Sequence, residues 1–266
     1  MAICSQPQAS RCAWHLLLRV CACAVLFSSN IGLTTNAIGA EPTSVAETFI
    51  DKPAVDNAPV PDTIGQRLLA CTACHGKQGR AASEGYYPRI AGKPAGYLYN
   101  QLVNFRGGRR QYPMMTYMVN HMSDAYLREI ADYFSDQHPP YPAPQPFALS
   151  SADFQRGQTL VQHGDASKKI PACIACHGNA MTGVLPATPG LLGLPRDYLV
   201  AQIGAWQTGV RHAAAPDCMS QVAKRLSAED IGAVASWLAA QPIPEGATAV
   251  APLSLKLPLV CGSVPN

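Results

Sequence analysis

The sequence predicts an all-α fold made of two tandem domains of the same kind. A six-residue motif occurs twice, as Cys-Thr-Ala-Cys-His-Gly at 71–76 and as Cys-Ile-Ala-Cys-His-Gly at 173–178. Apolar residues at helical spacing follow each copy, and matching positions in the two halves lie 101 to 104 residues apart. A drift of only three residues over that separation indicates two copies of one structural unit.

The repeated pattern Cys-x-x-Cys-His is the attachment pattern of c-type haem. Two thiols three positions apart can add to the two vinyl groups of one porphyrin, and the histidine that follows is held under the iron as its proximal ligand. We therefore predict two covalently attached haem c groups. Their ligands are Cys71, Cys74 and His75 in the first half and Cys173, Cys176 and His177 in the second.

The same pattern also occurs as half of a zinc site or as a redox dithiol. A zinc ribbon needs its second cysteine pair within about 15–20 residues, whereas Cys173 follows Cys74 by 99 residues. A redox dithiol needs no histidine after its second cysteine. Haem is the better interpretation because the full pattern occurs twice, inside a repeat.

Each helix has a start or stop signal in the sequence. In the first half we expect a short helix from Asp62 or Thr63, a helix over 97–105 that ends at Gly107, and a helix that begins at Ser123. In the second half, Ser151 is expected to cap one helix, and the last helix is expected over 227–239. Residues 198–206 match 97–105 at an offset of 101.

The first forty residues have the features of an export signal. Arg11 and Arg19 supply positive charge, 20–27 is an apolar stretch, and small residues lead to Ala40. Cleavage is expected after Ala40, with Ala37 as the alternative. The apolar stretch is shorter than the roughly 20 residues that span a bilayer, so an uncleaved anchor is the less favoured alternative.

Composition sets the remaining boundaries. Five prolines between 139 and 146 indicate an extended linker. The predicted order is a signal peptide (1–40), a flexible N-terminal extension (41–61), a first cytochrome c domain (62–136), a Pro-rich linker (137–150), a second domain (151–242) and a C-terminal tail (243–266). The net charge of +3 is too small to indicate nucleic acid or an anionic membrane as a partner.

Methionine is the expected second axial ligand of each iron. Met115 lies eight residues before Ser123, and Met219 lies eight before Ser227, so these two methionines superpose in the repeat. A thioether closes the sixth position and raises the reduction potential. Met114, Met118 and Met122 are expected to pack in the core. His121 and His212 are the alternative ligands, although they do not superpose.

Other residues are expected to support the haems. Pro88 and Pro189 could place a carbonyl against the ring N–H of the proximal histidine, or be ordinary loop prolines. Arg110 and Arg211 superpose, and either pair with haem propionates or are solvated. Cys218 and Cys261 remain outside the motifs and the leader; we predict a disulfide between them, with two free buried thiols as the alternative.

With both motifs, both methionines and the duplication in hand, the chain resembles the dihaem cytochrome c4 family. The resemblance covers about 62–242 and includes the Tyr-Leu-x-x-Gln pattern at Tyr97 and Tyr198. It implies two tandem class I cytochrome c domains, each wrapped around one haem, with the haem edges facing across the interface. It also implies electron transfer in the periplasm toward a terminal oxidase.

The sequence thus predicts an electron carrier and not an enzyme, because closed His/Met coordination leaves no iron open to a substrate. The expected partners are redox proteins, namely a respiratory complex, a terminal oxidase or a dehydrogenase; peripheral membrane attachment stays open. The first alternative is a cytochrome subunit bound permanently to a periplasmic dehydrogenase. The second is a dihaem peroxidase, which would need one vacant or displaceable ligand.

Overall fold

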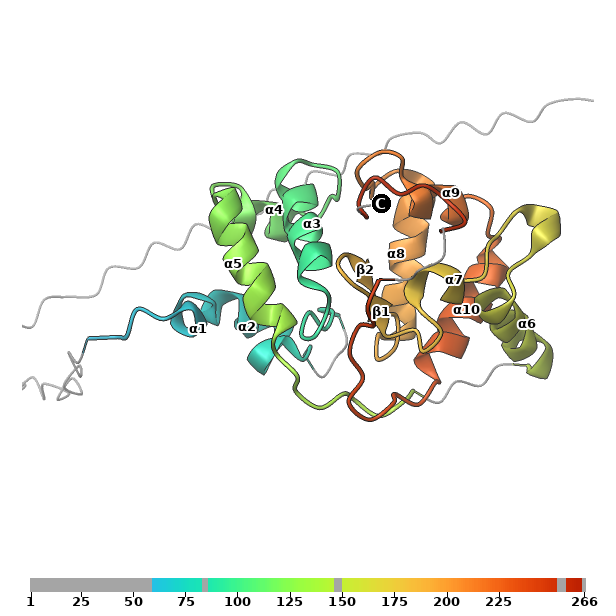
Figure 1. Cartoon of the computed structure of the whole chain (residues 1–266), viewed down its shortest axis with the longest axis horizontal. Helices are drawn as coiled ribbons and strands as arrows, with labels where there is room; N and C mark the ends of the chain where they lie inside the picture. The colour runs from blue at the N-terminus through green and yellow to red at the C-terminus, as the bar shows by residue number, and fades with distance from the viewer. Residues whose placement is uncertain (1–58, 83–85, 146–149, 253–256, 265–266) are drawn as a thin grey trace, which may run out of the picture. The chain divides into compact units, whose positions relative to one another are not determined.

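The computed structural model describes residues 59–82, 86–145, 150–252 and 257–264 (Figure 1). The predicted signal peptide, 1–40, and most of the predicted extension, 41–61, lie outside the described residues. Ala58–Asn266 forms one compact unit. This unit holds two hydrophobic cores, one in each half of the repeat.

The first half packs two long helices around its core. Leu98 and Phe105 on one helix meet Leu127 and Phe134 on the other, and all four are buried. Ser123 caps the second of these helices as predicted, because its hydroxyl accepts a hydrogen bond from the Tyr126 N–H. The elements are α1 (Ile64–Arg67), α2 (Leu69–His75), the 3-10 turn η1 (Lys77–Gly79), α3 (Ala95–Arg106), α4 (Pro113–Val119) and α5 (Asp124–Ser135).

The second half repeats this arrangement with added elements. Its last helix packs against both its first helix and the helix that matches α3 (Figure 1). A short antiparallel hairpin pairs Gly183 with Pro189 and Val184 with Thr188. The elements are α6 (Ser151–Gln162), the 3-10 turn η2 (Ala166–Lys168), α7 (Ile174–His177), β1 (Gly183–Val184), β2 (Thr188–Pro189), α8 (Arg196–Thr208), α9 (Cys218–Ala223) and α10 (Ala228–Ala239).

The structure confirms the all-α fold and corrects three details. Ser150, not Ser151, caps α6, because the Ser150 hydroxyl accepts from the Asp153 N–H and Ser151 is already helical. Helices α4 and α9 were not predicted, since each is only one to two turns long and shows no apolar period. The hairpin was also missed, because strands of two residues leave no alternating pattern.

The proline-rich segment after α5 is held by both halves. The Arg89 guanidinium donates to the carbonyl oxygens of Pro139 (2.6 Å) and Pro140 (3.1 Å), and it stacks 3.8 Å from the centre of the Tyr141 ring. That ring lies against Gly193, where a Cβ would come within 2.5 Å of it. The described part of this segment is therefore fixed at Arg89 and at Gly193. The domain limits themselves stay a prediction.

A buried carboxylate in the second half should make the stability of the fold sensitive to acid. Asp230 accepts hydrogen bonds from Arg156 and Lys168, both at 2.8 Å, and its side chain is 5% exposed. Burial alone would raise its pKa, but the bonds from Arg156, Lys168 and the Ser227 N–H lower the pKa from 3.8 to about 2. A depressed carboxylate pKa stabilises the fold above pH 3.8, and that contribution fades as the pH falls toward 2.

Asp230→Asn should therefore cost about 2 kcal/mol of unfolding free energy at pH 7. The gap between variant and wild type should narrow as the pH falls from 4 to 2. Urea unfolding of both proteins across this range measures the gap. A gap that stays constant with pH would show that the ionised carboxylate is not the source of the stability.

Candidate haem sites

Both Cys-x-x-Cys-His motifs lie on short helices whose last residue is the histidine. In the first half Cys71, Cys74 and His75 lie on α2; in the second, Cys176 and His177 lie on α7, with Cys173 as its N-cap. Residues three apart on a helix share one face, so the two sulfurs of each motif point to the same side. None of these four cysteines is part of a disulfide.

A glycine ends each motif helix in a conformation that other residues avoid. Gly76 has φ 75° and ψ 164°, and Gly178 has φ 82° and ψ 151°. At Gly76 a Cβ would also lie 2.3 Å from the Ala81 carbonyl oxygen, whereas at Gly178 the nearest atom is 3.4 Å away. The final glycine of the motif is therefore a backbone requirement, and it is stricter in the first half.

Alanine substitutions at Gly76 and Gly178 separate the cost of backbone strain from the cost of steric overlap. The backbone conformation should cost roughly 1–3 kcal/mol at either position. Gly76→Ala should cost about 2 kcal/mol more than Gly178→Ala, because only Gly76 has a fixed carbonyl in the way. Thermal unfolding of the two variants measures the difference. Equal losses would mean that the Ala81 segment moves aside freely.

The two motif histidines are buried and oriented by backbone carbonyls. The Nδ1 of His75 lies 2.9 Å from the Pro88 oxygen, and the Nδ1 of His177 lies 2.8 Å from the Pro189 oxygen. These distances confirm the expected role of the two prolines. Burial lowers the pKa of both histidines, opposed by these hydrogen bonds. If Nδ1 donates to the carbonyl oxygen, Nε2 is left free to bind a metal.

Three of the motif thiols have a raised pKa, the opposite of what a redox dithiol needs. Burial raises the pKa of Cys71 and Cys176, and it raises the pKa of Cys173 to about 12. A thioredoxin-like pair needs a lowered thiol pKa to form its reactive thiolate. The buried environment fits cysteines whose sulfurs end in thioether bonds.

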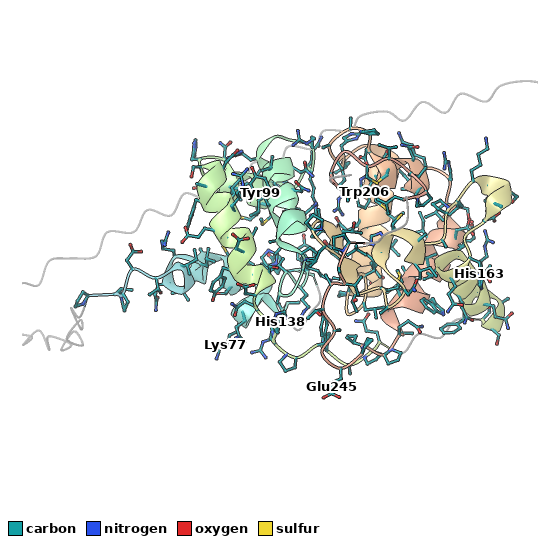
Figure 2. All side chains as sticks on the ribbon, in the orientation of Figure 1. Lys77, Tyr99, His138, His163, Trp206 and Glu245 are labelled. Carbon is teal, nitrogen blue, oxygen red and sulfur yellow. A yellow bond between two sulfur atoms is a disulfide. The ribbon has the colours of Figure 1, made fainter. Side chains whose placement is uncertain are left out.

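Residues of both motifs line one cavity of about 990 Å³. Met115 on α4 and Met219 on α9 line it, as do Met114, Met118 and Met122. In the second half Met219 is the only methionine of the described residues that lines it, since Met181 packs in the core. His121 and His212 are exposed and do not line the cavity. His138 and His163, labelled in Figure 2, are also exposed.

Comparison with known proteins agrees with this geometry. No protein-family model matches the chain. The chain is 41% identical over 175 residues to a thiosulfate dehydrogenase electron acceptor of Thiomonas intermedia, covering 65% of this chain and 79% of that protein. It is 31% identical over 183 residues to cytochrome c4 of Azotobacter vinelandii, covering 65% of this chain and 84% of that protein.

The chain belongs to the cytochrome c4 family. Its members carry two covalently bound haem c groups and transfer electrons, so this cytochrome c4 is a dihaem electron-transfer protein. A shorter relative, cytochrome c-554(548) of Halomonas halodenitrificans, is 37% identical over 81 residues. That match covers 98% of the relative but only 29% of this chain.

Solved structures confirm the fold of this cytochrome c4. Reduced recombinant cytochrome c4 from Pseudomonas stutzeri superposes with a TM-score of 0.58 and 30% identity, covering 66% of this chain and 95% of that one. Thiosulfate dehydrogenase (TsdBA) from Marichromatium purpuratum superposes with a TM-score of 0.59 and 32% identity. This chain spans 36% of that longer protein.

A disulfide fastens the tail of this cytochrome c4 beside Met219. Cys218 and Cys261 are joined, with Cα atoms 5.1 Å apart, which confirms the predicted bond. The Gly262 N–H donates to the Pro216 oxygen, and a Cβ at Gly262 would lie 2.1 Å from the Ala215 oxygen. The tail therefore braces the entry into α9, the helix that carries Met219.

Arginine, glutamine and tyrosine side chains join the two halves in a reciprocal network. Arg110 donates to Gln202 Oε1 (2.7 Å) and Tyr198 OH (3.1 Å) of the second half. Arg211 donates to Gln101 Oε1 (2.9 Å) of the first half. Each arginine also donates to the glutamine of its own half. The repeat offset of 101 residues relates Arg110 to Arg211 and Gln101 to Gln202, but an offset does not predict that these residues meet across the interface.

Four cations line the cavity without a carboxylate partner in the part of the chain that the structure describes. They are Arg89, Lys93, Arg110 and Arg211. Arg211 is 4% exposed, and burial, then Arg110, lowers its pKa. Burial, then Arg89, lowers the pKa of Lys93 to about 7. Buried cations are costly unless anions compensate them.

A buried donor on α8 also lacks a partner. The Nε1–H of Trp206, labelled in Figure 2, has no hydrogen-bond acceptor among the described residues, and the ring lines the cavity. Haem carries carboxylate propionates, which accept hydrogen bonds and neutralise cations. The donor set of this cavity therefore fits haem. None of the helices that the structure describes combines the length and the hydropathy of a transmembrane span.

Proposed function

We propose that this cytochrome c4 is the periplasmic electron acceptor of a thiosulfate-oxidising dehydrogenase. The observation that carries the proposal is the 41% identity to a protein named for that role, which exceeds the 31% identity to cytochrome c4 of Azotobacter vinelandii. A second such protein, from Stutzerimonas stutzeri, is 34% identical over 173 residues. The TsdBA structure, itself a thiosulfate dehydrogenase, contains a region of the same fold.

The residues of each half hold one haem. Cys71 and Cys74 would hold the first through thioether bonds, and Cys173 and Cys176 would hold the second. His75 and His177 would bind the two irons, with Met115 and Met219 as their second protein ligands. Bound haem supplies one-electron chemistry. The chain orients each imidazole through the contact of its Nδ1 with a backbone carbonyl oxygen.

Arg110 and Arg211 are proposed as propionate partners. Both line the cavity, both lack a carboxylate partner among the described residues, and Arg211 is buried. The Trp206 indole N–H is a third donor of this kind. The network that joins the halves would thus also bind the acidic edges of both haems.

Reduction by a dehydrogenase tests the main proposal. The ferric protein is mixed with thiosulfate and a catalytic amount of the dehydrogenase of the same organism, and haem reduction is followed by stopped-flow absorbance. Reduction should require both thiosulfate and the dehydrogenase. A dehydrogenase that reduces ferricyanide with thiosulfate but leaves this protein oxidised would rule the proposal out.

A permanent subunit of a dehydrogenase is the second candidate, because the TsdBA structure holds this fold within a longer chain. Co-purification with a catalytic subunit at high salt would favour it over a mobile carrier. In either role the protein makes no bond in a substrate, and peroxide turnover with a reduced donor should stay at background. The terminal acceptor is proposed to be an oxidase or another respiratory complex.

The proposed location rests on the leader sequence. Residues 1–40 are proposed as a cleaved signal peptide and 41–61 as an extension, followed by haem domains at 62–136 and 151–242 with the linker 137–150 between them and the tail 243–266 after them. N-terminal sequencing of the mature protein should begin at Glu41. A mature chain that still contains 20–27 would indicate an anchor instead.

A further inference from the structure

The two halves differ in charge at the loop that orients the proximal histidine. Pro88 and Pro189 are equivalent, and at the same offset of 101 residues Arg89 matches Gly190 and Lys93 matches Leu194. The first half thus carries two cations where the second carries none. Leu194 is buried in the core of the second half.

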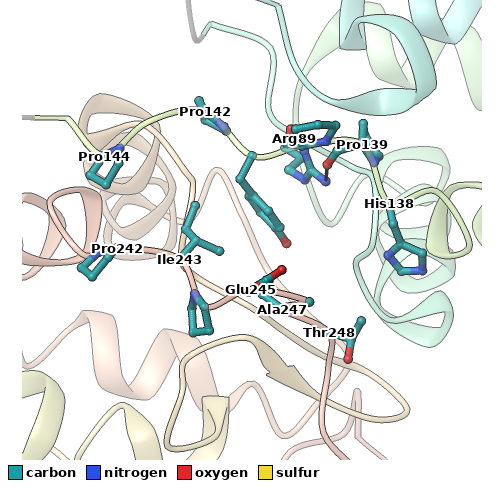
Figure 3. Close-up of a pocket in the computed structure, with 14 residues that line it drawn as sticks. Arg89, His138, Pro139, Pro142, Pro144, Pro242, Ile243, Glu245, Ala247 and Thr248 are labelled. Carbon is teal, nitrogen blue, oxygen red and sulfur yellow. Dashed lines mark hydrogen bonds between the residues drawn. The ribbon is translucent and has the colours of Figure 1, made fainter.

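The Arg89 guanidinium is fully hydrogen-bonded to backbone carbonyl oxygens. It donates to the carbonyl oxygens of Ala91, Pro139 and Pro140, and it stacks on Tyr141. Figure 3 shows Arg89 beside Pro139, at the wall of a second pocket formed by the linker and residues 242–248. All three nitrogens of this guanidinium have an acceptor, so Arg89 serves to hold the linker.

Lys93 reaches into the other half. Its Nζ donates to the Gly190 oxygen at 2.7 Å, and the residue is 4% exposed. Gly190 directly follows Pro189, whose carbonyl aims the His177 ring. Lys93, Pro189 and His177 also line the same cavity. The second haem site therefore contains a cation that its own half does not supply.

We propose that Lys93 acts on the second haem from across the interface. The positive charge of its ammonium group raises the reduction potential of that haem. A cation near an iron favours the ferrous state, which carries one positive charge fewer than the ferric state. Inside a protein, one nearby charge changes such an equilibrium by about an order of magnitude. The inference rests on His177 as the proximal ligand of the second haem and not on the identity of the electron donor.

Potentiometric titration of the full-length holoprotein tests the inference. The variants are Lys93→Gln and Lys93→Met, with the exposed Lys224→Gln as a control. Met115→His and Met219→His identify the two haems, because each should lower only its own potential. At pH 6 both Lys93 variants should make reduction of the second haem about tenfold less favourable, a shift of about 59 mV. Lys224→Gln should leave both potentials in place.

Three results would overturn the inference: unchanged potentials in both Lys93 variants, an equal shift of both haems, or a shift with Met but not with Gln. The last would assign the effect to the hydrogen bond and not to the charge. The absorption of methionine-ligated ferric haem, recorded on each variant, shows that the axial ligands are intact. Because no dehydrogenase takes part, a failed thiosulfate assay leaves the outcome unaffected.

Discussion

Alanine in place of Met219 is expected to open the second iron to carbon monoxide. Met219 lines the cavity from α9, and so does His177, whose ring contacts the Pro189 carbonyl oxygen. Without the thioether the reduced iron has a vacant sixth position, which an external ligand can take. The reduced variant should bind about one carbon monoxide per two haems, and the potential of the second haem should fall. Difference spectra and a redox titration measure both effects.

Met181→Ala is the matched control, since it removes the other methionine of the second half. Met181 is 3% exposed and packs in the core, away from the cavity lining. The variant should lose about 2–5 kcal/mol of unfolding free energy but bind no carbon monoxide. If Met219→Ala stays closed to carbon monoxide, another residue is the ligand, and His212 is the first to examine.

Serine at both Cys173 and Cys176 is expected to remove one haem. A hydroxyl cannot form the thioether bond, and the proximal histidine alone holds the porphyrin weakly. The protein exported in a haem-attaching host should then carry a single covalent haem, and intact-mass spectrometry counts it. The second half should also become less stable, because the apolar wall of its cavity is left facing water.

The double variant Cys218→Ser with Cys261→Ser controls for the loss of two sulfurs. It removes the disulfide that braces α9 but touches neither attachment motif, so two haems should remain attached. The loss of a 43-residue cross-link should cost roughly 4 kcal/mol in the chain-entropy account. Two haems on the Cys173/Cys176 variant would show that these cysteines do not carry the second porphyrin.

The features that were predicted from the sequence are those that local chemistry dictates. The attachment motif needs fixed spacing, Ser123 and Ser227 are good helix caps, and the long helices α5 and α10 have apolar faces. Helix α8 was predicted from its match to the first half at an offset of 101 residues. The offset between halves singled out Met115 and Met219 without any structure. Helices α4 and α9 were not predicted because neither shows an apolar period. Pro113 begins α4, and Asp217 caps α9.

Contacts between the halves could not be predicted in the same way. Nothing near Lys93 in the chain indicates that its ammonium meets the Gly190 carbonyl, 97 residues later. The same holds for Gly96, where a Cβ would lie 2.6 Å from the Pro186 oxygen. Such contacts depend on how two folded surfaces fit, whereas a repeat shows only that the surfaces are related.

The reciprocal network has the character of an isologous interface. Arg110 reaches the glutamine of the second half as Arg211 reaches that of the first, and Arg110 pairs with Arg211 in an antiparallel bridge. Separate copies of one subunit form this pattern across a two-fold axis. The two halves are thus arranged like the two subunits of a homodimer. Because they share one polypeptide, each half can differ in sequence from the other, and the contact of Lys93 with Gly190 occurs once, whereas a symmetric pair would have to make it twice.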